Sequence, residues 1–131
     1  MIATTDIANI IAEGCSAFGL PIFQVGNVER GEITSERIVI VPKPQNEGKF
    51  WRKCFVEVNI CVPDDDIGAD LQRLNELEKS AYSHFKRYTV GNYDGTPYRY
   101  KKDSIGIEED TQMKCHYVNV RVLFESLNTK E

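Results

Sequence analysis

The sequence has few of the residues that carry most recognisable protein chemistry. Among its 131 residues are only two histidines, one tryptophan and four cysteines. The cysteines form no CxxC pair, which argues against a zinc ribbon or a thioredoxin-like redox motif. Neither GxGxxG nor GxxxxGK[ST] occurs, so the common phosphate-cradling loops are missing. We therefore expect no cofactor, and four reduced, mostly buried thiols at Cys15, Cys54, Cys61 and Cys115.

Long apolar runs and an excess of positive charge are also missing. No apolar stretch approaches the roughly 20 residues that a membrane-spanning helix needs. The first residues, from Met1 to Asp6, lack the basic and apolar regions of a signal peptide. Lysine and arginine number 16 against 20 acidic residues, a formal net charge of −4, which disfavours a dedicated nucleic-acid binder. We expect a soluble cytoplasmic protein with no membrane partner.

The composition is that of an ordinary globular protein, and residues 1–131 fit one domain. Apolar residues at helical spacing predict a first helix over residues 6–18, which Thr4 or Thr5 would cap and Gly19 would end. A second helix is predicted over about residues 69–88, with Leu71 and Tyr88 on its apolar face. The acidic run Asp64–Asp66 would supply its N-terminus.

Five segments have the patterns of strands. They are residues 22–28, 37–42, 52–62, 104–109 and 114–127. In the third and fifth, apolar side chains alternate with polar ones, so one face of each strand should meet the core. Pro42 and Pro44 should stop the second strand. We expect loops at residues 29–32, 43–49 and 89–100, a turn at Gly26-Asn27, and a frayed tail over residues 128–131.

The predicted order is one helix, two or three strands, a second helix, and two or three more strands. Strands in blocks between helices indicate an α+β fold, a mostly antiparallel sheet with two helices packed on one face.

The candidate sites for chemistry each have a simpler explanation. Asp64–Asp66 has oxygen ligands that suit a hard cation, but capping of the following helix explains it better. Cys115 and His116 are neighbours, yet adjacent side chains on a strand point to opposite faces. Cys54 and Cys61 also face opposite sides. We therefore expect no catalytic, metal-binding or cofactor-binding residues and no enzymatic activity.

Two segments interleave basic and aromatic residues. Such segments can stack on single-stranded nucleic acid, but aromatic residues and arginine also anchor protein interfaces. With a net negative charge, we favour a protein partner. The candidate interaction residues are Lys49, Trp51, Arg52, Lys53, Tyr98, Arg99, Tyr100 and Lys101.

Self-association is the partner interaction that the pattern favours most. The expected loops at residues 43–49 and 89–103 are long compared with typical connections, and long loops on a rigid sheet often bind partners. Acidic and basic strips on one small subunit suit head-to-tail contacts, which close into rings when the rotation permits.

In its segment order the chain resembles the tail terminator or tail-completion proteins of tailed bacteriophages. The resemblance runs from about Asp6 to Leu127 and includes the strands at 37–41 and 51–62, the acidic break at 64–66, the helix at 71–88 and the final strand. It implies a structural, non-catalytic subunit of a phage or prophage virion. In that family such domains form a homo-oligomeric ring, usually hexameric, that caps the tail tube and joins it to the head.

Two alternatives remain open from the sequence. The first is a small-ligand or regulatory binding module that dimerises through a strand edge and holds a pocket between the second helix and the sheet. The second, weaker alternative is an enzyme that uses Cys115 or His116.

Overall fold

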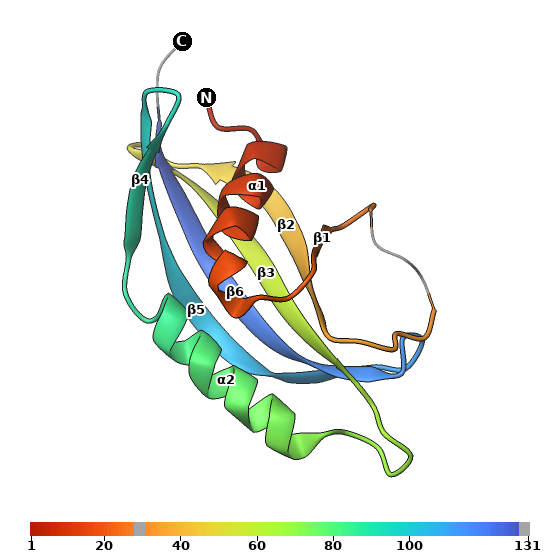
Figure 1. Ribbon diagram of the computed structural model, residues 1–131. Coiled ribbons are helices and arrows are strands. Elements are labelled where there is room, and N and C mark those ends of the chain that lie inside the picture. Colours follow the sequence, from red (N-terminus) through yellow and green to blue (C-terminus); the bar gives the residue numbers. More distant parts are fainter. Residues whose placement is uncertain (28–30, 129–131) are drawn as a thin grey trace.

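The computed structural model describes residues 1–27 and 31–128 of the chain (Figure 1). Two α-helices, a short 3-10 helix and a six-stranded sheet make up this part, and the sheet order is β1-β2-β3-β6-β5-β4. All neighbouring strands are antiparallel except β1 and β2. The elements are α1 (Thr4–Gly14), η1 (Ser16–Phe18), β1 (Ile22–Gln24), β2 (Arg37–Glu47), β3 (Trp51–Pro63), α2 (Leu71–Phe85), β4 (Thr89–Tyr93), β5 (Thr96–Asp110) and β6 (Cys115–Leu127). The predicted α+β class is confirmed.

The sheet is strongly curled, and both helices lie on its concave face (Figure 1). The alternation predicted for the two long strands decides which side chains meet the helices. Val58 of β3 is opposite Val120 of β6, and both are fully buried. The main core combines these strand positions with the apolar stripes of both helices, including Ile7 and Ile11 of α1 and Leu74, Ala81 and Phe85 of α2. Burial of this apolar surface is the main stabilising contribution to the fold.

Helix α1 begins differently from the prediction, because its N-cap residue is Ala3 rather than Thr4 or Thr5. Asp6 accepts a hydrogen bond from the backbone N–H of Ala3 at 2.9 Å, so the carboxylate satisfies an otherwise unpaired donor at the helix start. The helix ends at Gly14, and η1 then extends to Phe18. Gly19 follows with φ of 67°, the left-handed conformation expected of the glycine that ends this segment.

Helix α2 is shorter than predicted and does not start on the acidic run. Its N-cap is Asp70, whose side chain accepts a hydrogen bond from Arg73 N at 3.2 Å. The predicted capping role of Asp64–Asp66 is therefore wrong. Asp65 instead stabilises its own turn by accepting backbone N–H groups from Ile67 and Gly68. Leu71 is 71% exposed, which places it outside the apolar face that the sequence predicted.

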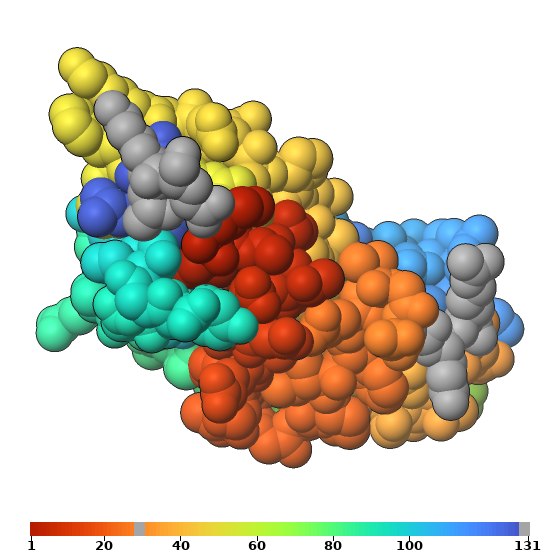
Figure 2. Space-filling model, turned by 90° about the horizontal axis from the view of Figure 1, so that it is seen from above, coloured from red at the N-terminus to blue at the C-terminus, as the bar shows by residue number. Residues whose placement is uncertain are grey.

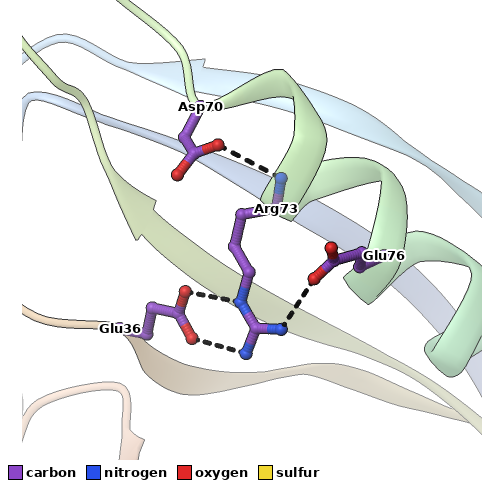
Figure 3. A network of polar contacts seen from close by, with 4 residues as sticks. All are labelled: Glu36, Asp70, Arg73 and Glu76. Atoms are coloured by element: carbon purple, nitrogen blue, oxygen red, sulfur yellow. Dashed lines mark hydrogen bonds and ion pairs between the residues drawn. The ribbon is translucent and has the colours of Figure 1, made fainter.

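A polar network fixes the first turn of α2 to the segment that leads into β2 (Figure 3). Arg73 donates two hydrogen bonds to Glu36, from Nε at 2.7 Å and from Nη2 at 2.8 Å. Its Nη1 donates a third to Glu76 at 3.3 Å. The two-pronged contact with Glu36 restricts how α2 can lie across the sheet.

Strand β2 continues through both prolines, so the predicted stop at Pro42 and the loop at 43–49 are wrong. Its register with β3 shifts between Pro42 and Gln45, where β2 has one extra residue. On its other side, β1 pairs only with residues 38–40 of β2. Beyond these residues, no strand of the described part pairs with β2 on that side. Proline is tolerated at such a sheet edge, because no hydrogen bond to a neighbouring strand is lost.

The predicted loop over residues 89–100 is a β-hairpin formed by β4 and the start of β5. Asp94 and Gly95 make its turn with φ of 49° and 83°, and Asn92 accepts a hydrogen bond from Gly95 N at 3.0 Å. The hairpin lies beside α1 (Figure 2), and Tyr93 Oη donates to Asp6 at 2.9 Å. The short strand predicted at 104–109 is the second half of β5.

The remaining predictions concern segment ends. Strand β1 ends at Gln24 and the predicted turn at Gly26-Asn27 follows it, with Asn27 N bonded to the Gln24 carbonyl at 3.0 Å. Residues 28–30 of the predicted strand and loop, and residues 129–131 of the predicted tail, lie outside the described part. Within the described ranges, neither helix has the length and apolarity to cross a membrane.

Candidate functional site: an uncovered sheet face with charged ends

The convex face of the sheet carries no helix within the described part of the chain (Figure 1). Strand register places the odd-numbered residues of β3 and β6 on this face, because their even-numbered neighbours fill the concave core. Arg99 and Lys101 of β5 join the same face through their pairing with Glu125 and Leu123. Aromatic, aliphatic and charged side chains therefore alternate over much of this face. Toward its other end, Val39, Cys61 and Cys115 are buried together with Ile33 in a small second core.

At one end of this face five residues form a cluster that we call the basic patch: Trp51, Lys53, Tyr88, Arg99 and Lys101. The Arg99 guanidinium lies 4.4 Å from the Trp51 ring centroid and 4.8 Å from that of Tyr88. Lys101 Nζ lies 4.7 Å from the same Tyr88 ring. Cations held against aromatic rings in this way present rigid, partly desolvated positive charge.

A buried carboxylate forms ion pairs with two cations of the basic patch. Glu125 is 4% exposed, and it forms ion pairs with Arg99 at 3.2 Å and with Lys53 at 3.9 Å. One buried negative charge thus orients two surface cations, and the third cation, Lys101, extends the patch along β5. The outward-facing charge of the patch is positive.

The structure divides the eight predicted interaction residues between the two faces of the sheet and one turn. Trp51, Lys53, Arg99 and Lys101 meet in the basic patch, although the sequence placed them in two separate segments. Lys49 lies in the β2–β3 turn, with Nζ 5.5 Å from the Phe50 ring. The remaining three, Arg52, Tyr98 and Tyr100, are on strand positions of the concave face.

Tyr100 is a core residue, so its predicted place on the interaction surface is wrong. It is 4% exposed and belongs to the main core. Its ring and that of Tyr98 are both stacked near Phe124, at centroid distances of 6.2 Å and 5.2 Å. Arg52 is half-buried, and its Nε is buried without a hydrogen-bond partner among the described residues.

Sequence reasoning missed four residues of this face: Phe55, Tyr88, Arg121 and Glu125. The Arg121 guanidinium lies 3.8 Å from the Phe55 ring centroid, across neighbouring strands. The signal for three of them was the odd-numbered polar or aromatic positions in the two alternating strands. Tyr88 had no such signal, because it lies between α2 and β4.

The opposite end of the sheet carries mostly negative charge, and we call it the acidic end: Asp64, Asp65, Asp66, Glu108, Glu109 and Asp110. His116 connects two of its carboxylates, with Nδ1 2.7 Å from Asp64 and Nε2 3.4 Å from Glu109. These three residues offer possible metal-ligand atoms within 4.8 Å of one another. Both imidazole nitrogens already face a carboxylate, so the same contacts fasten the residue 64–68 turn to β5 and β6.

The four thiols are buried and unpaired, as predicted. Burial raises the pKa of Cys15 to about 12. A hydrogen bond with Cys115, together with burial, raises the pKa of Cys61 as well. Cys115 is fully buried in a small second core with Cys61, while His116 lies on the other face of β6, so the two cannot act together. The hydrogen bond between the thiols of Cys61 and Cys115 lowers the pKa of Cys115, but all four thiols are buried, and inaccessible thiols are poor nucleophiles.

A small cavity of about 150 Å³ lies on the convex side, lined by Val39, Asn59, Cys61, Asp110, Met113 and Tyr117. Ligand pockets for metabolite-sized molecules usually measure about 300–1,000 Å³, so this cavity is undersized for one. The pocket expected between the second helix and the sheet is not where this cavity lies. Buried side chains of α2, among them Leu74 and Phe85, pack directly on the sheet there.

No protein-family model and no curated protein sequence matches the chain. Among the solved structures that match, one has a TM-score of 0.58 at 10% sequence identity. The match covers 98% of this chain and 96% of the other. At this identity the likeness shows a shared fold alone, and nearly the whole of each chain takes part in it.

Proposed function

We propose that this protein is a structural subunit of a phage or prophage virion, a tail terminator or head–tail joining protein that acts by ring assembly. The observation that carries the proposal is the convex face, which no helix of the described residues covers and which has the basic patch at one end. A sheet face with aromatic residues and arginine among charged side chains has the composition of a protein interface. The segment order on which the resemblance to tail terminators rests is also the order of elements along this chain.

The subunit has no catalytic activity in this proposal, and it needs no cofactor or metal. It is made in the bacterial cytoplasm and becomes part of the virion when it joins the tail. Its partners are further copies of itself, the tail-tube protein and the head connector. The burial of Cys115 and the position of His116 between two carboxylates count against the alternative of an enzyme that uses either residue.

The first test is the solution mass by light scattering across a concentration series, with negative-stain images of the largest species. We expect rings, usually hexamers in the proposed family, either free or on purified tail tubes that lack their terminator. Lys53→Glu should weaken this assembly, because Lys53 belongs to the basic patch. Lys79→Glu, an exposed reversal on α2, is the matched control and should assemble normally.

Failure of the wild-type protein both to form rings and to bind tail tubes would refute the proposal. A stable dimer that binds a metabolite would favour the alternative of a small-ligand module. The filled space beneath α2 counts against the pocket that this alternative expected there. A larger hollow of about 450 Å³ lies at the acidic end, lined by charged residues that include Asp66 and Lys114.

A further inference from the structure

We propose that the basic patch of one copy binds the acidic end of the next copy, so that the subunits join head to tail. The inference rests on the proposed function and specifies the contact that would build the ring. The partner is a second copy of this chain, because the chain carries both halves of a complementary pair at opposite ends of its own sheet.

The two charged regions are too far apart to neutralise each other within one molecule. Lys53 and Pro63 are ten residues apart on β3, which is about 33 Å measured along the strand at a rise of about 3.3 Å per residue, and somewhat less through space because the sheet is curled. This separation is several times the screening length of about 8 Å at physiological ionic strength. Each end therefore presents its charge to solvent or to a partner.

Both ends are fixed in shape before any contact forms. In the basic patch, Arg99 is held by two aromatic rings and by Glu125. At the acidic end, Glu108 accepts a hydrogen bond from Tyr117 Oη at 2.8 Å and Asp110 accepts one from Met113 N at 2.9 Å. Groups that are already ordered lose little conformational entropy on binding.

The two charged regions can meet between copies in two ways. In an antiparallel two-fold contact, each basic patch would face the acidic end of the other copy, and the assembly would close at two subunits. A head-to-tail contact leaves one free basic patch and one free acidic end on every open chain, so the assembly grows until it closes into a ring. The ring of the proposed function requires the head-to-tail contact, and a solution mass that stops at the dimer would refute it.

Two charge-reversed variants test the inference directly. Lys53→Glu with Lys101→Glu makes both ends acidic. Reversing the four exposed carboxylates of the acidic end, Asp65→Lys, Asp66→Lys, Glu108→Lys and Glu109→Lys, makes both ends basic. All six side chains belong to exposed residues. Each variant alone should need at least about tenfold higher concentration to assemble, because opposed like charges cost several kcal/mol. An equimolar mixture of the two should assemble again.

The matched control reverses two exposed lysines on or beside α2, Lys79→Glu with Lys86→Glu, and changes the net charge by the same amount as the first variant. It should assemble like the wild type. Circular dichroism and thermal unfolding should be used to check that each variant is folded. Solution mass should be measured in about 50 mM and about 500 mM salt, since wild-type assembly should weaken as screening increases.

Several outcomes would overturn the inference. The first is ring formation by both reversed variants as well as by the wild type, a result that would leave the proposed function intact. Another is folded variants whose mixture stays monomeric. A wild-type protein that remains monomeric at every concentration would also overturn it, and tail-tube binding would then decide the proposed function separately. Salt-sensitive binding of short single-stranded DNA, lost in Lys53→Glu with Lys101→Glu while the mass is unchanged, would identify a different occupant.

Discussion

Removing the contact between Glu36 and Arg73 tests how α2 is held in place over the concave face. The perturbation is a double-mutant cycle of Glu36→Gln, Arg73→Gln and the two together. In the wild type, Arg73 makes paired hydrogen bonds of 2.7 and 2.8 Å to the two oxygens of Glu36 (Figure 3). Glutamine keeps much of the size of both side chains but removes the charges.

The expected coupling energy follows from the geometry and the exposure of the pair. Exposed ion pairs contribute about 0.2–1 kcal/mol, and paired hydrogen bonds from arginine place a contact at the top of that range. The two side chains are 37% and 23% exposed, so solvent screens the pair only in part. We expect a coupling of about 1 kcal/mol, which corresponds to a change in Tm of about 4 °C for a domain of this size.

The assay is urea unfolding of the four proteins, followed by circular dichroism at low and high salt. The matched control is the cycle between Arg73 and Glu76, which share one hydrogen bond of 3.3 Å and where Glu76 is 54% exposed. That cycle should give only about 0.3 kcal/mol. A Glu36–Arg73 coupling no larger than the control would refute the claim that this contact fixes α2.

Three further predictions concern the core and the hairpin. Because burial raises the pKa of Cys15 from 9.0 to about 12, the unfolded chain loses this proton first, and stability should fall between pH 9 and 12. Cys15→Ala should reduce the loss of unfolding free energy near pH 10.5 by about 2 kcal/mol, measured by urea unfolding. An unchanged dependence of the unfolding free energy on pH between 9 and 12 would contradict this prediction. Phe124→Ala should cost about 3–5 kcal/mol in the same assay, because its ring is fully buried against two tyrosines, and a loss under about 1 kcal/mol would be inconsistent with this packing. Gly91→Ala should cost about 1–2 kcal/mol by thermal unfolding, since its Cβ would lie 2.4 Å from the Tyr98 ring; a neutral effect would show that the ring moves freely.

The proposed contact surface was only partly visible in the sequence. Both basic–aromatic segments could be found by composition, and Trp51 and Arg99 indeed meet in the structure. Composition could not say that Tyr100 turns into the core, since the side of the sheet on which a residue lies depends on the register between β5 and β6. Nor could it bring together Asp64, Glu109 and His116, which come from three separate segments.

The sequence also failed where a local signal was overruled by a neighbour distant in the chain. Pro42 and Pro44 normally end a strand, but the edge position of β2 beyond its pairing with β1 leaves room for them. The Gly- and Tyr-rich segment after α2 has a weak strand pattern, and its turn residues favoured a loop. Pairing of β5 with the long strand β6 is what makes it a hairpin.

The sequence by itself determined the two helices, the two long alternating strands and the α+β class, because periodicity of 3.6 or 2 residues is a local property of the chain. The sequence also predicted two helices on one face of the sheet, and only the tertiary structure decided how strongly the sheet curls and which side chains its convex face carries. That arrangement leaves the convex face open, with Lys53 near one end and Asp64 beyond the other. The physical reason is that strand order and register decide which side chains share a face and where the two charged regions lie. Strand order and register join residues that are far apart in sequence, so they leave no local pattern.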